Sequence, residues 1–294
     1  MTLEGKMNNK IILHINYCEQ GQTLEETCEK AAAWGYDGLE FRSKRPGIVE
    51  DMNKYLETIY KAAKKYGLEC VLFGGGNPDV VNDDPSIREK SLVYSEKFYP
   101  RAKEMFDFDV CNLFLGAVLN PSKEVPYAQF ANHGSYIARP EHWELAEIGL
   151  KSLGEIAEKN NFKFAMETHP NYLHDSIAAT MKLVELSGSK SIGVNLDYIN
   201  SDVVPGGMSI EDAIEAIGNR LFYVHLKNII KLSDGDRIRI GLGDGEYNNR
   251  HIMKKLKEAD YKGHICVEAP RQGDREWFAQ EDLAYIKSVI KDII

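Results

Sequence analysis

Short apolar runs alternate along the chain with longer segments in which apolar residues recur at helical spacing. The runs are five to eight residues long and rich in Val, Ile, Leu and Phe, which is typical of buried strands, whereas the longer segments are typical of amphipathic helices. We predict strands at residues 11–16, 38–42, 68–73, 110–116, 163–169, 192–198, 221–228 and 264–270. The clearest predicted helices are at residues 23–35, 49–67, 142–160 and 275–293.

Strand and helix alternate eight times, which predicts one α/β domain with a closed parallel sheet. Parallel neighbours need crossover connections, and eight strand–helix units favour a (β/α)8 TIM barrel over an open sheet. The first helix has clear end signals, because Thr23 and Glu26 form a capping box and Gly35 is a stop. We expect a single domain over residues 1–294, in which residues 1–9 are an N-terminal leader.

Two stretches, residues 117–140 and 229–249, are longer than a minimal barrel needs. The first has no clear periodicity, and loops of this length in a compact domain are usually lids or binding loops. Both follow predicted strand ends, so in a parallel barrel they lie on the same face. We expect these inserted active-site loops to cover the site and exclude water from it.

Composition excludes several classes of protein. The chain is 43% hydrophobic and 28% charged, no apolar stretch approaches the roughly 18 residues of a membrane span, and the N-terminus lacks the apolar segment of a secretory signal. We expect a soluble, cytoplasmic protein without a membrane partner. The formal net charge of -9 argues against sequence-tolerant nucleic-acid binding. Five scattered cysteines without a C-x-x-C pair indicate neither a disulfide framework nor a thiolate zinc site.

Four residues with metal-binding side chains stand at the C-terminal ends of consecutive predicted strands: Glu167, Asp197, His225 and Glu268. One such carboxylate is often a helix cap or an ion-pair partner, and one such histidine is often a core residue. Four together instead predict a metal site, because the carboxyl ends of barrel strands meet at one mouth. Three carboxylates and an imidazole are mostly hard donors, so we expect one divalent ion, Mn²⁺ first, with Mg²⁺, Co²⁺ and Zn²⁺ as alternatives.

A cation held in this way, with coordination positions left open, can bind adjacent oxygens of a hydroxy-ketone. It then stabilises the enediolate that forms when the neighbouring C–H loses its proton. Proton transfer needs an acid and a base beside the reacting carbon. Glu167 and Glu268 come from opposite sides of the arc of the fifth to eighth strands, and we predict that they are this catalytic pair.

Four further residues are candidate substrate contacts: His169, Lys227, Arg271 and Glu40. His169 and Lys227 each lie two residues beyond a predicted ligand, so on an extended strand their side chains point the same way as the ligand. Glu40 ends the second strand and could face the mouth or form a structural ion pair. Arg271 follows the last ligand by three residues and could reach an anionic group on the substrate or remain a solvated loop residue.

Several segments together resemble the sugar isomerase and epimerase group of the xylose isomerase-like TIM-barrel superfamily. These segments are METHPNYLHD, VNLDYIN, FYVHLKN, GLGDGEYN and CVEAP. The earlier GYDGLEFR is similar to the second strand of that group, so the resemblance covers nearly the whole chain. The resemblance implies that the four strand-end residues bind one divalent metal ion, and that Glu167 and Glu268 exchange the proton, as in the ketose 3-epimerases of the superfamily. It also implies a homodimer or homotetramer.

One position departs from the superfamily pattern. Many members have D-x-x-H after the sixth strand, whereas this chain has DYIN at residues 197–200. Asn200 can hydrogen-bond a sugar hydroxyl, so we count it among the substrate contacts, but it does not readily bind a metal. The segment after His225 lacks another histidine until His251, which disfavours an endonuclease IV-like DNA repair enzyme with a histidine-rich trinuclear zinc site.

The sequence therefore predicts a divalent-metal-dependent isomerase or epimerase that acts on a small-molecule sugar or keto-sugar through a metal-stabilised enediolate. A lyase or dehydratase, or a keto-glycoside-cleaving enzyme, is the alternative, because it would use the same proton abstraction and then expel a β-oxygen. A non-catalytic sugar-binding barrel subunit is a third class, although four intact ligands argue against it.

Overall fold

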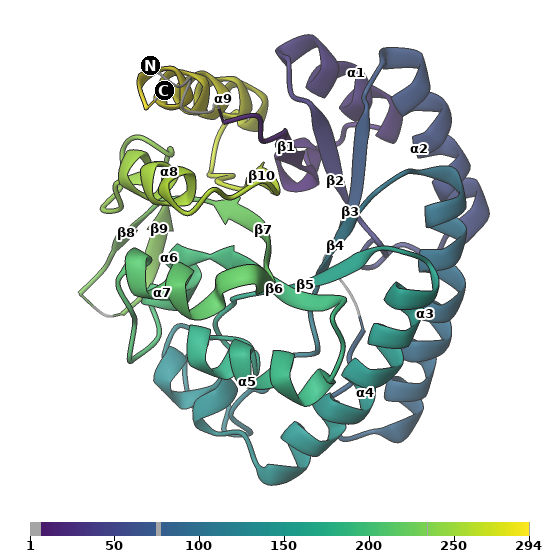
Figure 1. Cartoon of the computed structure of the whole chain (residues 1–294), viewed down its shortest axis with the longest axis vertical. Coiled ribbons are helices and arrows are strands. Elements are labelled where there is room, and N and C mark those ends of the chain that lie inside the picture. Colours follow the sequence, from purple (N-terminus) through teal and green to yellow (C-terminus); the bar gives the residue numbers. More distant parts are fainter. Residues whose placement is uncertain (1–6, 75–77, 234, 294) are drawn as a thin grey trace.

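The computed structural model of the protein describes residues 7–74, 78–233 and 235–293, so residues 1–6 of the predicted leader lie outside the described residues. Eight parallel strands in the described chain form a nearly closed barrel with helices around it (Figure 1). These strands are β1 (Ile11–His14), β2 (Gly38–Arg42), β3 (Cys70–Gly74), β4 (Val110–Leu113), β5 (Lys163–Glu167), β6 (Ile192–Asp197), β7 (Leu221–Leu226) and β10 (His264–Val267). The predicted (β/α)8 fold is confirmed.

Hydrogen bonding follows the order β3-β2-β1-β10-β7-β6-β5-β4. The last barrel strand, β10, pairs in parallel with the first, β1, as closure requires. β3 and β4 stand at the two ends of this order and lie beside each other. The carboxyl ends of all the barrel strands therefore open onto one face.

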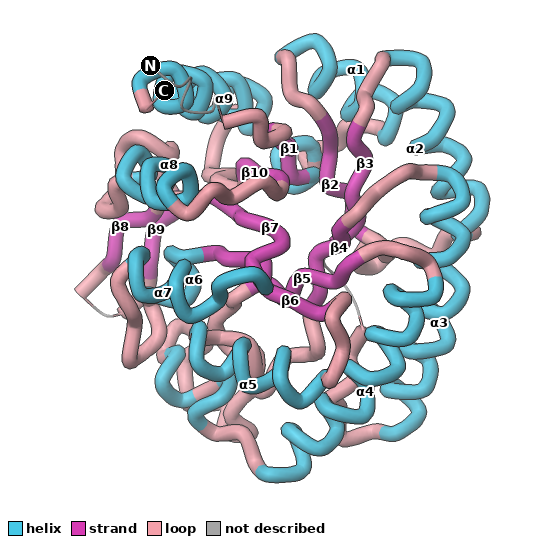
Figure 2. Tube along the Cα trace, in the orientation of Figure 1, coloured by secondary structure: helices cyan, strands magenta, loops and turns pink. Residues whose placement is uncertain are grey.

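Helices lie outside the barrel and cover its outer surface (Figure 2). They are α1 (Leu24–Trp34), α2 (Met52–Tyr66), α3 (Pro85–Met105), α4 (Pro140–Lys159), α5 (Ile177–Ser187), α6 (Tyr198–Asp202), α7 (Ile210–Ile217), α8 (Asn249–Glu258) and α9 (Arg275–Asp292). The capping box predicted for the first helix is present, because the side chains of Thr23 and Glu26 each accept a hydrogen bond from the other's backbone amide. Gly35 ends this helix with a left-handed φ of 89°.

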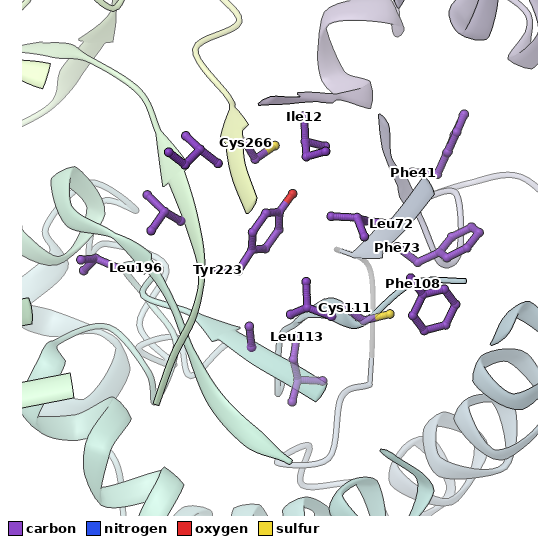
Figure 3. Packing of buried hydrophobic residues seen from close by; sticks show 14 of the residues in the cluster. Ile12, Phe41, Leu72, Phe73, Phe108, Cys111, Leu113, Leu196, Tyr223 and Cys266 are labelled. Carbon is purple, nitrogen blue, oxygen red and sulfur yellow. The ribbon is translucent and has the colours of Figure 1, made fainter. Parts of the chain in front are cut away.

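Side chains of the barrel strands alternate between the barrel interior and the helix layer. Ile12, Leu72 and Tyr223 turn towards the middle of the barrel in Figure 3, whereas Phe73 and Phe108 turn towards the helices. The rings of Phe73 and Phe108 pack edge to face with centroids 6.0 Å apart. Both sets are buried, so the inner set fills the barrel while the outer set joins it to the helices.

The two predicted insertions contain regular structure that the sequence did not predict. Their elements are the 3₁₀ turns η2 (Phe130–Asn132) and η3 (Gly134–Tyr136) and the antiparallel hairpin of β8 (Ile229–Lys231) and β9 (Arg237–Arg239). Asn228 fixes the base of the hairpin, because its Nδ2 donates to the carbonyls of Leu242 and Tyr247 at 2.9 and 2.8 Å. Whether these segments cover the site during a reaction stays a prediction. Within the described residues, no helix is both long and apolar enough to cross a membrane.

Candidate metal centre and active site

Four side chains that could bind a metal ion meet at the carboxyl end of the barrel, and they are the four candidate ligands singled out from the sequence. Glu167 ends β5, Asp197 ends β6, His225 lies in β7 and Glu268 follows β10. Asp197 stands opposite His225 in the β6–β7 ladder, so strand register brings these two residues together. One ligand atom from each of the four lies within 4.8 Å of the others, and all four residues are buried.

This donor set fits a small divalent cation. An ion with bonds of about 2.0–2.2 Å holds opposite ligand atoms about 4.0–4.4 Å apart, so small side-chain adjustments would close the cluster around it. Lys227 supplies one compensating charge, with Nζ 2.5 Å from Asp197 Oδ2 and 3.1 Å from Glu268 Oε2. Glu40 and Glu167 are buried in the same centre. Buried carboxylates need nearby positive charge to offset the cost of removing them from water. A divalent cation would supply the positive charge that this cluster of carboxylates needs in addition to Lys227.

The ring of His225 is held between carboxylates on both of its edges. Its Nδ1 faces Glu268 Oε2 at 3.0 Å and Glu167 Oε2 at 3.3 Å, while its Nε2 lies 2.9 Å from Glu40 Oε2. A proton on Nε2 that is donated to Glu40 leaves the Nδ1 lone pair for a metal. Glu40 is 0% exposed. It is therefore a partner of His225, and contact between Glu40 and substrate stays a prediction.

Two asparagines that sequence reasoning did not select as site residues donate to the ligand carboxylates. Asn112 Nδ2 lies 2.7 Å from Glu167 Oε2, and Asn16 Nδ2 lies 3.1 Å from Glu268 Oε1. Asn112 is in β4, and Asn16 follows β1 by two residues. The inward parity of β4 is the signal that could have identified Asn112, since every second side chain of a strand faces the same way. Asn16 lies in the 3₁₀ turn Ile15–Cys18, where this parity does not hold.

Asn200, the position that departs from the superfamily pattern, also contacts ligand carboxylates. Its Nδ2 lies 2.9 Å from Asp197 Oδ2 and 3.3 Å from Glu167 Oε1. Its Oδ1 accepts a hydrogen bond of 3.1 Å from Arg237 Nη1 in β9. Arg237 therefore fixes the direction of the amide, with the NH₂ group towards the ligands. Contact between Asn200 and substrate stays a prediction.

The two carboxyl groups predicted to be acid and base differ in proton affinity. Burial raises the pKa of Glu167 to about 8. Burial acts in the same direction on Glu268, but the ammonium of Lys227 and the imidazole of His14 outweigh it and hold the pKa of Glu268 well below its usual range. A divalent cation beside these groups would favour the ionised form of both.

A cavity of about 780 Å³ adjoins the ligands, and Glu167 and Glu268 form part of its lining. His169, a predicted substrate contact, lines the same cavity. Its Nδ1 lies 2.9 Å from the carbonyl oxygen of Pro170, so Nδ1 carries the proton and Nε2 is left as an acceptor. Burial lowers the pKa of His169 to about 3, which keeps the ring neutral near pH 7. The structure therefore places a neutral imidazole beside the space for a substrate.

Arg271 is not brought to the cavity. Its Nη1 lies 2.7 Å from Asp282 Oδ2 and its Nη2 lies 3.2 Å from Glu281 Oε2, both in α9. Its guanidinium also lies 4.0 Å from the ring centroid of Phe278. These partners hold Arg271 against α9, and binding of an anionic group of the substrate by Arg271 stays a prediction. Lys227, also predicted to bind substrate, lies among the ligands, and its contact with substrate stays a prediction.

Comparison with known proteins identifies relatives along almost the whole chain. Residues 28–289 match a family described as xylose isomerase-like TIM barrel. The chain is 30% identical over 268 residues to an inosose dehydratase of Clostridium perfringens strain 13, and the match covers 84% of this chain and 82% of that protein.

Solved structures show the same architecture at lower identity. A 3-keto-D-glucoside 4-epimerase from E. coli superposes with a TM-score of 0.75 at 16% identity, covering 96% of this chain and 100% of that chain. A xylose isomerase-like TIM barrel protein from Mycobacterium smegmatis in complex with magnesium gives a TM-score of 0.75 at 17% identity, covering 97% of this chain and 98% of that chain.

Proposed function

The chain belongs to the xylose isomerase-like TIM-barrel family, and on that premise we propose that it is a divalent-metal-dependent enzyme. The proposed reaction is proton transfer beside the carbonyl of a small sugar or a sugar-derived ketone. The convergence of the four ligands within 4.8 Å at the edge of a cavity carries this proposal. Relatives that are themselves enzymes support the assignment to an enzyme class.

We propose Glu167, Asp197, His225 and Glu268 as the metal ligands. Mn²⁺ is the first expectation and Mg²⁺ the second, because carboxylate oxygens suit both ions, and a structural neighbour is in complex with magnesium. When bound, the cation would polarise the substrate carbonyl and offset the negative charge that proton removal leaves on the substrate.

Glu167 and Glu268 are the proposed proton-transfer groups. Both line the cavity, and both lie within 3.3 Å of the same His225 nitrogen, so they flank one small volume. An isomerase or epimerase needs one group to remove the proton and another to return it, and this pair meets that need. The amide of Asn112 holds one oxygen of Glu167 in place during this transfer.

Dehydration is the second candidate, and the inosose dehydratase that aligns with 84% of the chain favours it. The same carboxylate would remove the proton next to the ketone. A hydroxyl on the following carbon would then leave as water, with a proton from the second carboxyl group. Isomerisation and dehydration therefore differ in the fate of the β-hydroxyl and share the first proton transfer.

Metal analysis followed by proton NMR in deuterated water tests the proposal. We expect bound divalent ion in the purified protein and metal-dependent deuterium uptake by at least one compound from a set of ketoses and inososes. Glu167→Gln and Glu268→Gln should each lower this exchange by about 10²–10⁴-fold. Glu69→Gln, at a side chain that is 82% exposed, is the matched control and should leave the exchange unchanged.

The products of the same experiment separate the two candidates. Exchange with retention of all substituents indicates an isomerase or epimerase, and an unsaturated or dehydrated product indicates a dehydratase. The proposal is refuted if the protein binds no divalent ion and no compound exchanges deuterium. It is also refuted if the wild type and both glutamate variants exchange deuterium at equal rates.

A further inference from the structure

The cavity beside the metal centre has linings of two kinds. Phe114, His169 and Tyr172, from the segments that follow β4 and β5, form an aromatic side. Their rings pack edge to face with centroids 5.1–5.5 Å apart. The rest of the lining includes five cationic side chains from β2, the loop after it, α3, β9 and α9: Arg42, Lys44, Lys90, Arg239 and Arg275.

Within the part of the chain that the structure describes, most of these cations form no ion pair with a carboxylate. Arg42 is the exception, because its Nε and Nη2 lie 2.6 and 2.9 Å from the two carboxylate oxygens of Glu19. Arg275 donates from Nη1 to the carbonyl of Asn16 at 2.8 Å, while its buried Nε has no hydrogen-bond partner in the described chain. Across residues 7–74, 78–233 and 235–293, no ion pair holds Lys44, Lys90, Arg239 or Arg275. We call these four side chains the cationic wall.

The carboxylates of the cavity do not balance the cationic wall. Glu19 is already bound by an arginine, and Glu167 and Glu268 belong to the metal centre. Asp79 accepts a hydrogen bond of 2.6 Å from Asn82 and, within the described residues, forms no ion pair with the cationic wall. The whole chain has a formal net charge of -9, which makes a local excess of positive charge in one cavity more informative.

Unpaired cations in a concave site attract and hold anions. Field lines are focused in such a cavity, and arginine and lysine are the side chains that bind carboxylates and phosphates most effectively. A neutral polyol would leave all four charges without an anionic partner. The members of the cationic wall come from four separate segments, so the excess of positive charge in the cavity does not arise from one local run of sequence.

We propose that the natural substrate carries an anionic group, a carboxylate or a phosphate, which the cationic wall binds while the carbonyl end lies at the metal centre. The aromatic side then faces the carbon skeleton between these two ends. The proposal rests on the proposed function for the position of the carbonyl, whereas anion binding by the wall does not depend on it.

Calorimetric titration with inorganic phosphate and with acetate tests the wall directly. The titrations use the metal-loaded protein and the same protein after chelation, because phosphate also binds metal ions. The double variant Lys90→Gln/Arg239→Gln removes two charges from the wall. Lys61→Gln/Arg101→Gln is the matched control, since it removes two charges from side chains that are 78% and 40% exposed on α2 and α3.

We expect at least one anion to bind the wild type with and without metal. The cavity variant should bind it at least about tenfold more weakly, because charge-assisted contacts are lost, and the control should match the wild type. Phosphate binding without acetate binding points to a phosphorylated substrate, and the reverse points to a carboxylate. Equal affinity in the two double variants, or no binding of either anion to the wild type, overturns the proposal.

Kinetic comparison separates this proposal from the proposed function. If no ketone exchanges deuterium, the proposed function fails, but the anion titration still decides whether the wall binds anions. If a neutral ketose and its phosphorylated or carboxylated counterpart exchange with equal kcat/KM, the function stands and the anionic substrate class is refuted. A lower KM for the charged compound that is lost in Lys90→Gln/Arg239→Gln supports both.

Discussion

Glu40 is expected to set the metal affinity of His225 without contacting the metal. Its Oε2 lies 2.9 Å from His225 Nε2, and both residues are buried. With a metal ion on Nδ1, this hydrogen bond would hold the ring proton on Nε2 and make Nδ1 the better donor. Loss of such a partner typically weakens metal binding by about 10–100-fold, which corresponds to about 1.4–2.7 kcal/mol.

Two substitutions divide this effect into charge and hydrogen bonding. Glu40→Gln keeps an acceptor for the Nε2 proton but loses the charge, so we expect binding of Mn²⁺ to weaken about tenfold. Glu40→Leu also loses the acceptor, so we expect a loss of about a hundredfold. Calorimetric titration of the chelator-treated protein measures the affinity, and nitrogen NMR of the histidine ring reports which nitrogen carries the proton.

Glu69→Gln is the control, because it removes an exposed carboxylate just before β3. This variant should bind metal as tightly as the wild type does. Circular dichroism checks that each variant is folded. The reasoning is refuted if folded Glu40→Leu protein binds Mn²⁺ as tightly as the wild type. It is also refuted if the ring proton of His225 lies on Nδ1 in the metal-loaded wild type.

Three further predictions concern stability, each measured by urea denaturation. Burial lowers the pKa of His174 to about 4, so as the pH falls below about 6.5 the unfolded chain takes up the proton first and the free energy of unfolding decreases. His174→Gln lacks this proton uptake, so its loss of unfolding free energy relative to the wild type should be about 2 kcal/mol smaller at about pH 5 than at about pH 7.5. Equal losses at the two pH values would contradict this. Gly38→Ala should cost about 1–3 kcal/mol, because a Cβ would lie 2.1 Å from the carbonyl oxygen of Cys70, and an unchanged midpoint would count against this contact. Asp282→Ala should cost about 3–5 kcal/mol, because it leaves the guanidinium of Arg271 without its buried partner at 2.7 Å; a cost below about 1 kcal/mol would show that the pair is dispensable.

The fold and the convergence of the ligands were accessible from sequence for related reasons. Parallel strands buried on both faces are continuous apolar runs, so a charged residue at the end of each run is conspicuous. Once the runs are placed in a barrel, their carboxyl ends must share a face, which brings Glu167, Asp197 and Glu268 together. Lys227 directly follows β7, two residues after His225, and its Nζ lies 2.5 Å from the candidate ligand Asp197.

Other parts of the site depend on contacts between distant segments, which no local pattern encodes. The alternation of side chains along β2 indicates that Glu40 faces the barrel interior. Whether Glu40 reaches His225 depends on the register between the strands, which the sequence does not show. Arg271 lies three residues after a ligand, yet its position is set by Asp282 in α9. The hairpin that brings Arg237 to the ligands has short strands within a polar insertion, so its pattern does not stand out in the sequence.

The β8–β9 hairpin carries Arg237 and Arg239 two positions apart, one at Asn200 beside the metal ligands and the other in the cationic wall. A shift of Arg239 would therefore also move Arg237, which orients Asn200, so one short strand would link the two ends of the proposed substrate. In evolutionary terms, the ligands are tied to the register of the barrel, whereas a surface hairpin tolerates insertion and replacement. Exchange of this hairpin between relatives would offer a route to new substrates that leaves the four ligands in place.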